Sequence, residues 1–406
     1  MNAFSPRTFS TDWEIMVIDR LERCADTEKL LAFAGALRSE FDLPIQVDWN
    51  TLELALGINS QFDQFVQRVR SVTDRAAQLV RELGLELYPA GSHPVEPMYN
   101  SSHIHIGTLH DEGKGIYLES RLMRYAPVFG AIAANSPFAH GFAGQYKSYR
   151  IRDNAHGCTR PQSARDPRLS QFTWGGDASP KVYSAPTLEV RITDCASSRR
   201  LLAELVVFTA AFVHWLGENT SEYRLSETEY VDCMTNRWSA AKYGMQATFL
   251  WNGTERPVVE IIDEMLDQSA ASLAALGADR KDLALLQAMI EKRRCQADLV
   301  LDLGKRYPDP YCLASVHSKL VRDWDAFDNY VVSSAPLDPA PAPDRERILN
   351  EHLSVVGEGT HFYNLRNAMY YPPTLVDELI ETLAGDQLVH VENTCRGMLL
   401  SRVEKS

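Results

Sequence analysis

The chain lacks the short motifs that mark the commonest nucleotide-binding and hydrolytic scaffolds. It has no Gly-x-x-x-x-Gly-Lys-Ser phosphate loop, no Gly-x-Gly-x-x-Gly turn after a strand and no Gly-x-Ser-x-Gly nucleophile elbow. These patterns hold a phosphate against backbone N–H groups or present a serine on a strained turn. Their absence disfavours P-loop enzymes, dinucleotide-binding domains and α/β-hydrolases.

Cysteine and positive charge are also scarce. The 406 residues include seven cysteines, an odd number, and no Cys-x-x-Cys pair, so reduced core thiols are expected rather than a disulfide framework or a zinc site. The formal net charge of -13 argues against nucleic-acid binding, which needs dominant clusters of Lys and Arg. The cysteines are Cys24, Cys158, Cys195, Cys233, Cys295, Cys312 and Cys395.

Long apolar runs are missing as well. No stretch shows the ~18 consecutive apolar residues that a membrane span needs, and Met1 to Arg7 have no apolar core like that of a signal peptide. We therefore expect a cytoplasmic protein with no membrane partner. The composition, 45% hydrophobic and 23% charged, is that of a globular protein long enough to bury a sizeable core.

Two carboxylates stand out in the apolar, strand-like stretch from Phe9 to Asp19. Asp12 and Glu14 are separated by one residue, and the period of two in a strand places both on one face. Two neighbouring carboxylates are explained by an edge strand with one face exposed to solvent, or by a divalent cation that both carboxylates bind. This stretch alone leaves both explanations open.

Further carboxylates lie on other strand-like segments. Glu53 lies in Ile45 to Leu56 and Glu189 in Thr187 to Asp194, each alternating with apolar residues, and Asp48 is a less certain candidate. This recurrence favours the cation over isolated solvated residues.

Two histidines lie on a third strand-like segment, Ser102 to Gly107. His103 and His105 share one face, and the pattern does not decide which of them joins the carboxylates. Oxygen ligands with one imidazole suit Mg²⁺ or Mn²⁺ better than zinc, and such ions commonly hold nucleotide phosphates. Arg191 shares the face of Glu189 and is suited to meet a transferring phosphoryl group.

The chain divides into a part with strands, about 1–196, and a mostly helical part, about 197–406. In the first part Phe138 to Pro186 reads as a long loop, and in the second Ser333 to Pro343 contains four prolines among small residues, which predicts a mobile lid or linker. Helices are predicted at Thr27–Phe41, Phe62–Leu83, Ile116–Ala134, Leu201–Glu218, Glu227–Gln246, Val258–Leu276, Lys281–Leu303 and Tyr311–Asp328.

Six motifs, in order, resemble those of the glutamate–cysteine ligase family, in its bacterial carboxylate–amine ligase branch. They correspond to its first-strand Glu-x-Glu, its second-strand acidic motif, Gly-x-His-Val-His-Val-Gly, Ala-Asn-Ser-Pro with Ser-Tyr-Arg, Glu-Phe-Arg and Asn-Arg-Trp. In this chain they are Asp12-Trp13-Glu14, Thr51 to Ala55, Ser102 to Gly107, Ala134 to Phe138 with Lys147 to Arg150, Leu188 to Arg191 and Asn236 to Gly244.

This resemblance implies the glutamine-synthetase-like fold, of class α+β. A curved antiparallel sheet would form a cup with the active site on its concave face, helices would back the sheet, and the C-terminal part would be mostly helical. Residues 1–406 would then form a single catalytic domain.

The resemblance also implies an ATP-dependent ligase that forms an amide of γ-glutamyl type through an acyl phosphate. Its substrates would be a small amino acid and an amine, with ATP and Mg²⁺ or Mn²⁺ as cofactors, and a homo-oligomer is compatible with it. The expected metal ligands are Asp12, Glu14, Glu53, His103 and Glu189; the expected catalytic residues are Arg191, Arg150 and Arg237; and Arg191, Arg237 and His105 would bind the nucleotide.

Other functions remain open at this level. Asp12 stands where the family usually has Glu, which shortens one ligand by a methylene group and mildly favours a non-catalytic metal- or nucleotide-binding homologue. A small-molecule kinase on the same fold would release ADP without joining an amine. A metal-dependent hydrolase would use the acidic residues without ATP.

Overall fold

The computed structural model of the chain describes residues 7–19, 23–48, 51–96, 98–107, 112–139, 142–153, 176–181, 187–219, 223, 225–343, 360–361, 380–394 and 397–403. Among them, seven strands form one antiparallel sheet in the order β2-β3-β1-β5-β9-β8, with β4 also paired to β1. These strands are β1 (Phe9–Ile18), β2 (Gln46–Asp48), β3 (Thr51–Ala55), β4 (Glu86–Tyr88), β5 (Ser102–Gly107), β8 (Ala178–Lys181) and β9 (Thr187–Val190).

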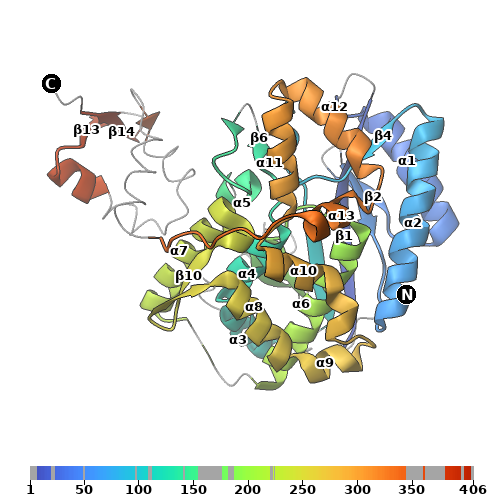
Figure 1. Ribbon diagram of the computed structural model, residues 1–406, viewed down its shortest axis with the longest axis horizontal. Coiled ribbons are helices and arrows are strands. Elements are labelled where there is room, and N and C mark those ends of the chain that lie inside the picture. Colours follow the sequence, from blue (N-terminus) through green and yellow to red (C-terminus); the bar gives the residue numbers. More distant parts are fainter. Residues whose placement is uncertain are drawn as a thin grey trace.

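Helices make up most of the remaining described residues (Figure 1). They are α1 (Thr27–Phe41), α2 (Phe62–Glu82), α3 (Glu112–Met123), α4 (Ala126–Ala133), α5 (Tyr149–Asp153), α6 (Arg199–Asn219), α7 (Glu227–Tyr243), α8 (Val258–Gln268), α9 (Ala270–Ala275), α10 (Ala284–Lys292), α11 (Gln296–Arg306), α12 (Pro310–Val321) and α13 (Ala326–Ser333), with 3-10 turns at Gly244–Gln246 and Arg280–Leu283. The predicted α+β class, antiparallel sheet and mostly helical C-terminal part are confirmed.

Three small sheets complete the fold. Strands β6 (Phe138–Ala139) and β7 (Phe142–Ala143) pair with each other, as do β10 (Thr248–Trp251) and β11 (Thr254–Pro257). Strands β12 (Thr360–His361), β14 (Gly397–Arg402) and β13 (Val389–Thr394) form the third sheet, at one side of the molecule in Figure 1.

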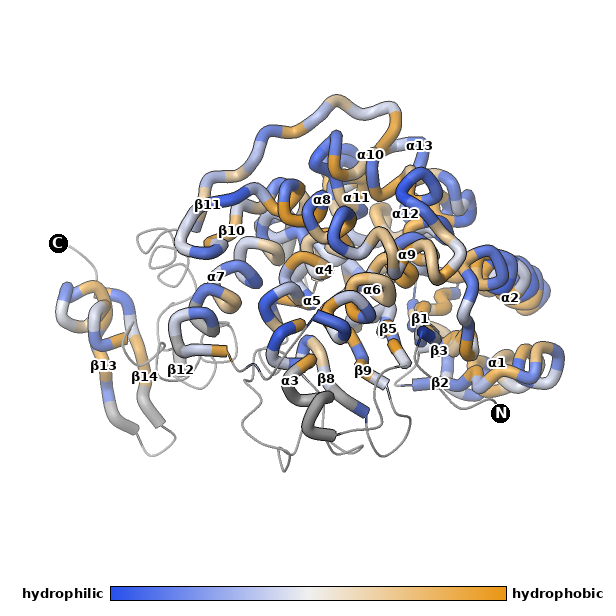
Figure 2. Tube along the Cα trace, turned by 90° about the horizontal axis from the view of Figure 1, so that it is seen from below, coloured by the Kyte–Doolittle hydropathy of each residue, from blue (hydrophilic) through white to orange (hydrophobic). Residues whose placement is uncertain are grey.

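The alternation of β1 separates a core face from a polar face. Trp13, Ile15 and Val17 are buried in the main hydrophobic core, and the Trp13 indole Nε1 donates a hydrogen bond to the Ala196 carbonyl at 3.1 Å. Figure 2 shows α2 and α6 on one side of β1, β3, β5 and β9. The core therefore lies between the sheet and these helices, and the polar residues of β1 lie on the opposite face.

Helix α6 is an apolar helix of the core. By length and composition alone it could cross a membrane, because an 18-residue window within it reaches a mean hydropathy of 1.5. However, 83% of that window is buried inside the protein. Its apolar residues pack against α2, α3 and the sheet, which is the environment of a core helix.

Several predicted elements are divided in the structure. The predicted strand from Ile45 to Leu56 is two strands, β2 and β3, because Asp48 pairs with Thr51 and the chain reverses between them. The predicted loop from Phe138 to Pro186 contains β6, β7, α5 and β8. The long helices predicted to begin at Ile116, Val258, Lys281 and Tyr311 each break into shorter ones, since hydrophobic periodicity does not show where one helix ends and the next begins.

The β10–β11 hairpin lies in the part of the chain that was predicted to be mostly helical, between two predicted helices. Asn252 and Gly253 connect its strands with φ angles of 53° and 75°. An Asn-Gly pair in this left-handed conformation is the strongest short-range signal for a two-residue hairpin. The sequence therefore contained the signal for this element.

The proline-rich segment that follows α13 is held in place, contrary to the prediction of a mobile lid or linker. The Leu337 amide donates to the Lys292 carbonyl at 2.9 Å, and the Ala340 amide donates to the Gln246 carbonyl at 2.7 Å. The Gln246 side chain also donates to the Asp338 carbonyl at 2.8 Å. These bonds join residues 334–343 to helical elements distant in sequence, and composition alone does not reveal them.

We expect residues 334–343 to resist limited proteolysis, because a protease must first break these hydrogen bonds to extract the backbone. The substitution Gln246→Ala should increase cleavage there several-fold, on the scale of losing a bond worth about 1 kcal/mol. Fragment masses after timed digestion measure this. Gln287→Ala, in α10, is the matched control, and preferential cutting of the wild-type chain within 334–343 would contradict the prediction.

Candidate functional site

Strand register gathers the predicted site residues on one face of the large sheet, here called the site face. Asp12 lies opposite His103, Glu14 lies opposite Glu53, and His105 lies opposite Glu189. Directly opposite residues of an antiparallel pair point to the same side of the sheet. Six side chains distributed over four strands therefore share the site face.

At one end of the site face, Glu14, Asp48 and Glu53 form an acidic triad. Their carboxylate oxygens lie within 4.8 Å of one another. Gln46 Nε2 donates to Glu53 Oε1 at 2.9 Å, while Glu14 Oε2 accepts from the Ser101 amide at 2.8 Å and from its hydroxyl at 2.6 Å. Three converging carboxylates with oxygen atoms only suit a hard divalent cation such as Mg²⁺.

Burial and neighbouring charges change the titration of two members of the triad, Glu53 and Glu14. Burial, with the nearby charges of Asp12, Glu14 and Asp48, raises the pKa of Glu53 to about 8. Burial also raises the pKa of Glu14, although the Ser101 hydrogen bonds oppose this. Without a counter-ion, Glu14 and Glu53 therefore keep their protons to a higher pH than exposed carboxylates do.

The two histidines differ in their surroundings. His103 Nδ1 lies 3.8 Å from Glu14 Oε1 and 3.5 Å from Glu189 Oε1, and its Nε2 is 2.6 Å from the Ser101 hydroxyl. Burial, together with the Arg191 charge, lowers the pKa of His103 well below its ordinary value. The ring is therefore neutral near pH 7 and lies between two carboxylates, as a metal ligand would.

His105 instead pairs with Asp12. Its Nε2 lies 2.9 Å from Asp12 Oδ2, and its Nδ1 lies 3.3 Å from the Thr187 hydroxyl. Burial lowers the pKa of His105, but the carboxylates of Asp12 and Glu189 outweigh burial and raise it overall. The geometry thus favours His103 over His105 as the histidine beside a cation, and it places Asp12 against His105 rather than within the triad.

At the other end of the site face, Glu189 lies between two cations. Arg191 NH1 donates to Glu189 Oε1 at 2.7 Å, and Lys181 Nζ lies 2.9 Å from Oε2. Burial would raise the pKa of Glu189, but Arg191, the two histidines and Lys181 lower it well below its ordinary value. Lys181 was not identified from the sequence, since it lies in a segment that reads as a loop.

Arg150 supports this end from within the protein. Its guanidinium donates to the carbonyls of Arg191 at 2.9 Å and Ile192 at 3.2 Å, and it lies 3.7 Å from Asp194 Oδ1. Because Arg150 is buried and bonded to backbone, its role here is to fix the chain at Arg191. Direct contact of Arg150 with a substrate stays a prediction.

Asp194 links two of the sequence motifs, and sequence reasoning missed it. The buried carboxylate accepts from the Asn135 amide at 2.7 Å, the Ser136 hydroxyl at 2.8 Å and the Ser148 hydroxyl at 3.1 Å. A side chain on Gly91 would clash with Asp194, since an added Cβ would lie 2.8 Å from the Asp194 Cβ. The Asn-Ser-Pro and Ser-Tyr-Arg motifs therefore meet at a structural junction that positions Arg150.

Arg237 is also embedded in the protein. Its Nε and NH2 donate to the two carboxylate oxygens of Asp177 at 2.6 and 3.1 Å, and its NH1 donates to the Ile151 carbonyl at 2.7 Å. The Asp177 carbonyl in turn accepts from the Arg191 amide at 2.8 Å. This arrangement connects α7 to Arg191 through Asp177, and the predicted contact of Arg237 with a nucleotide remains untested.

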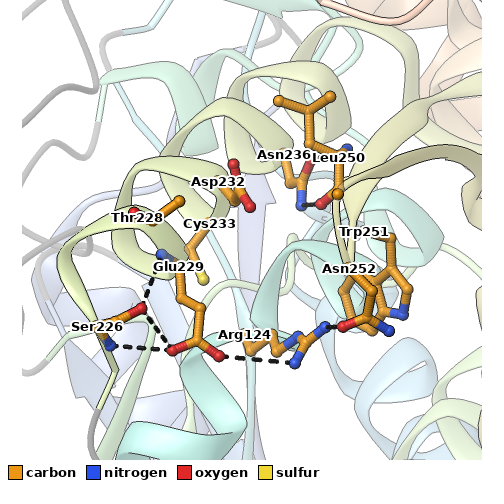
Figure 3. A pocket seen from close by; sticks show the side chains of 11 residues that line it. Arg124, Ser226, Thr228, Glu229, Asp232, Cys233, Asn236, Leu250, Trp251 and Asn252 are labelled. Atoms are coloured by element: carbon orange, nitrogen blue, oxygen red, sulfur yellow. Dashed lines mark hydrogen bonds and ion pairs between the residues drawn. The ribbon is translucent and has the colours of Figure 1, made fainter.

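A separate cavity of about 280 Å³ lies where α7 begins, next to the β10–β11 hairpin (Figure 3). Arg124 is the cation in this cavity. It lies 3.8 Å from Glu229, donates to the Asn252 side chain and stacks 4.6 Å from the centre of the Trp251 ring. The lining includes none of the residues of the site face, so the cavity is distinct from the candidate site.

Comparison with known proteins gives consistent matches. A family model described as glutamate–cysteine ligase family 2 matches residues 95–153 and 176–314. A putative glutamate–cysteine ligase 2 of Ralstonia pickettii is 22% identical over 348 residues, covering 72% of this chain and 89% of the relative. Another, of Mycolicibacterium paratuberculosis, is 26% identical over 324 residues, covering 66% and 82%.

Solved structures show the same fold at low sequence identity. The glutamate–cysteine ligase of Francisella tularensis, in complex with AMP, matches with a TM-score of 0.56 at 9% identity over 95% of this chain and 100% of that one. A bifunctional glutathione synthetase from Pasteurella multocida matches with a TM-score of 0.54 at 11% identity. That match covers 79% of this chain but only 54% of the synthetase, so this chain spans about half of its length. With the motifs on the site face and the matching family model, this chain is similar to the glutamate–cysteine ligase family.

Proposed function

We propose that this protein is an ATP-dependent carboxylate–amine ligase that forms an amide of γ-glutamyl type through an acyl phosphate. The family match supports an amide-forming ligase. The observation that carries the finer proposal is the division of charge on the site face, with the acidic triad at one end and Arg191 beside Lys181 at the other. A nucleotide bound to a divalent cation presents the complementary pattern of charge.

Mg²⁺, with Mn²⁺ as the substitute, is the metal that this donor set fits. The triad supplies oxygen atoms within reach of one another, and His103 and Glu189 lie beside it. Glu189 Oε2 is buried and lacks a hydrogen-bond donor among the described residues, because Lys181 approaches it outside hydrogen-bond geometry. When bound, the ion would join these carboxylates to the phosphates of ATP and neutralise their negative charge.

The chemistry that we propose needs no nucleophile from the protein. An oxygen of the substrate carboxylate attacks the terminal phosphorus of ATP, which forms the acyl phosphate and releases ADP. The amine nitrogen then attacks the acyl carbon, which forms the amide and releases phosphate. Arg191, held by Arg150 and Asp177, would neutralise the transferring phosphoryl group, so that catalysis rests on positioning and electrostatic stabilisation.

The decisive experiment measures ADP release from Mg²⁺–ATP against a matrix of amino acids and amines, with product masses. A ligase should release ADP only when acid and amine are both present and should give a product heavier by the amine less water. ADP release with the acid alone and no amide would favour the kinase. Nucleotide binding without ADP release under any pairing would favour a non-catalytic homologue, and acid release without ATP would favour a hydrolase.

Glu189→Gln should reduce turnover by about 10² or more, on the scale of losing one preorganised electrostatic contact. The amide keeps the shape of Glu189 but removes the charge that the proposal assigns to metal binding. Val190→Ile is the neighbouring control, since Val190 is buried on the core face and its change should leave the chemistry nearly unaffected. Full ATP-dependent product formation by Glu189→Gln would refute the assignment of Glu189 as a ligand.

Glu53→Gln should stabilise the metal-free protein at pH 8 but not at pH 4. Because the pKa of Glu53 rises from 4.5 in the unfolded chain to about 8 in the folded protein, the unfolded state loses its proton first and folding stability falls as the pH rises between these values. Glutamine removes this loss, and at about 1.4 kcal/mol for each pKa unit between the two states the gain at pH 8 should be on the order of 4 kcal/mol.

Denaturant unfolding at both pH values, with a chelator present, measures this difference. Glu255→Gln is the control, because Glu255 is exposed on β11 and far from the triad in sequence. A gain of equal size at both pH values would show that charge crowding in the triad is not its cause.

A further inference from the structure

We infer that the cavity beside α7, here called the α7 cavity, is a second ligand site that binds one small zwitterionic amino acid. The ammonium group of this ligand lies at Asp232 and its carboxylate at Arg124. Because α7 also carries Arg237, the ligand acts as an effector of the site face. Only this effector role rests on the proposed function, and the binding site itself does not.

Three segments form the walls of the α7 cavity (Figure 3). Glu229, Asp232 and Asn236 are spaced by three and four positions, so they lie on one face of α7. Residues 250–253 of the β10–β11 hairpin form a second wall, and Arg124, directly after α3, forms the third. The volume of about 280 Å³ is just below the ~300–1,000 Å³ typical of sites for drug-sized ligands, so a ligand of amino-acid size fits.

The Asp232 carboxylate is an anion without a partner in the α7 cavity. Among the described residues it makes neither a hydrogen bond nor an ion pair, and no dashed line reaches it in Figure 3. Asp232 is half-buried, and burial raises its pKa against the opposing charge of Arg124. An ammonium group would supply this carboxylate with both N–H donors and a positive charge.

Arg124 is a cation with unused donors. Its guanidinium lies 4.6 Å from the centre of the Trp251 ring and donates to the Asn252 side chain. Its NH1 lies 3.8 Å from Glu229 Oε1, which is beyond hydrogen-bond distance. The other N–H groups of Arg124 have no acceptor within the described ranges, and its side chain is 18% exposed. A guanidinium held in this way presents the paired donors that a carboxylate accepts.

Glu229 leaves these donors available, because both of its oxygens already accept other hydrogen bonds. Oε1 accepts from the Tyr223 hydroxyl at 2.6 Å, and Oε2 accepts from the Ser226 hydroxyl at 2.8 Å in the capping box that begins α7. In the part of the chain that the structure describes, no ion pair joins Arg124 to Asp232. The α7 cavity therefore presents one cation and one anion that do not neutralise each other, and a zwitterion matches this pattern.

Helix α7 connects the α7 cavity to the site face. Asn236 lines the cavity, and its neighbour Arg237 binds the Asp177 carboxylate through Nε at 2.6 Å. The Asp177 carbonyl accepts from the Arg191 amide at 2.8 Å. A ligand that holds α7 against the hairpin would also stabilise the bonds that position Arg191. Binding of the amino acid and binding of ATP should then strengthen each other by the same factor.

Isothermal titration calorimetry with each common amino acid in turn, without ATP or Mg²⁺, measures binding to the α7 cavity. Asp232→Asn should weaken the amino acid that binds best by about 10- to 100-fold, as for a lost hydrogen bond between charged groups. It should not lower the thermal midpoint, because Asp232 has no partner to lose among the described residues. Asp63→Asn is the matched control, since Asp63 is exposed on α2.

Blocked forms of that amino acid test the two charges separately. Its amide lacks the carboxylate and should bind wild type and Arg124→Gln equally, whereas its N-acetyl form lacks the ammonium group and should bind wild type and Asp232→Asn equally. If both blocked forms bind wild type as tightly as the free amino acid does, the assignment to a zwitterion is overturned. If Arg124→Gln does not fold, as judged by circular dichroism, Asp232→Asn decides the outcome.

Glu189→Gln distinguishes the α7 cavity from the site face. An amino acid in the α7 cavity should bind Glu189→Gln as it binds wild type. An amino acid that loses affinity in Glu189→Gln but not in Asp232→Asn is instead bound on the site face. If every amino acid that binds shows this second pattern, or if none binds, the inference is overturned.

The effector role has its own measurement. Saturation with the bound amino acid should lower the Kd of Mg²⁺–ATP several-fold in wild type but not in Asp232→Asn, and an unchanged Kd in wild type would overturn this role. If the wild-type protein binds no ATP, the proposed function and the effector role fail together. The amino-acid titrations then still decide whether the α7 cavity is a ligand site.

Discussion

The register of β1 against β3 and β5 is the constraint on which the site depends. Glu14 faces Glu53 and Asp12 faces His103 because these residues are direct partners in antiparallel pairs. A slip of one residue would move every carboxylate into the core and bring Trp13, Ile15 and Val17 to the site face. Burial of those three side chains against the helices therefore fixes the register, and the register places the polar residues.

This arrangement holds like charges together at a cost in stability. The raised pKa values of Glu14 and Glu53 show that their ionised forms are disfavoured, chiefly through burial. The surrounding structure limits that cost: Ser101 donates twice to Glu14, and the Asp194 junction holds Arg150 behind the strand that carries Arg191. Like charges that are held close together by buried hydrogen bonds are typical of sites that bind a counter-ion.

The parts of the site that follow strand periodicity could be predicted from sequence, and those that depend on distant partners could not. Alternation with apolar residues was enough to place Asp12, Glu14, Glu53, His103 and Glu189 on one face. Lys181 was missed because nothing in its neighbourhood marks β8 as a strand. The junction at Asp194 was missed because its partners lie 46 to 59 positions away in sequence.

Contacts between residues distant in sequence also explain where the predictions of the fold were wrong. Proline and alanine between Ser333 and Pro343 cannot form a helix or a ladder, yet the segment is fixed by bonds to Lys292 and Gln246 that no local rule contains. The β10–β11 hairpin is the opposite case, since its Asn-Gly turn is local and the helical reading of the surrounding sequence obscured it.

Glu189 connects the two ends of the site face, because its carboxylate lies close to residues at both of them. It lies within 3.5 Å of His103 on the side of the triad and within 2.7 Å of Arg191 on the other. A cation at the triad would draw the Glu189 carboxylate toward the triad, and an anion at Lys181 and Arg191 would draw those cations from Glu189, so binding of either should favour binding of the other. The coupling follows from electrostatics within one carboxylate's reach and needs no change of backbone conformation.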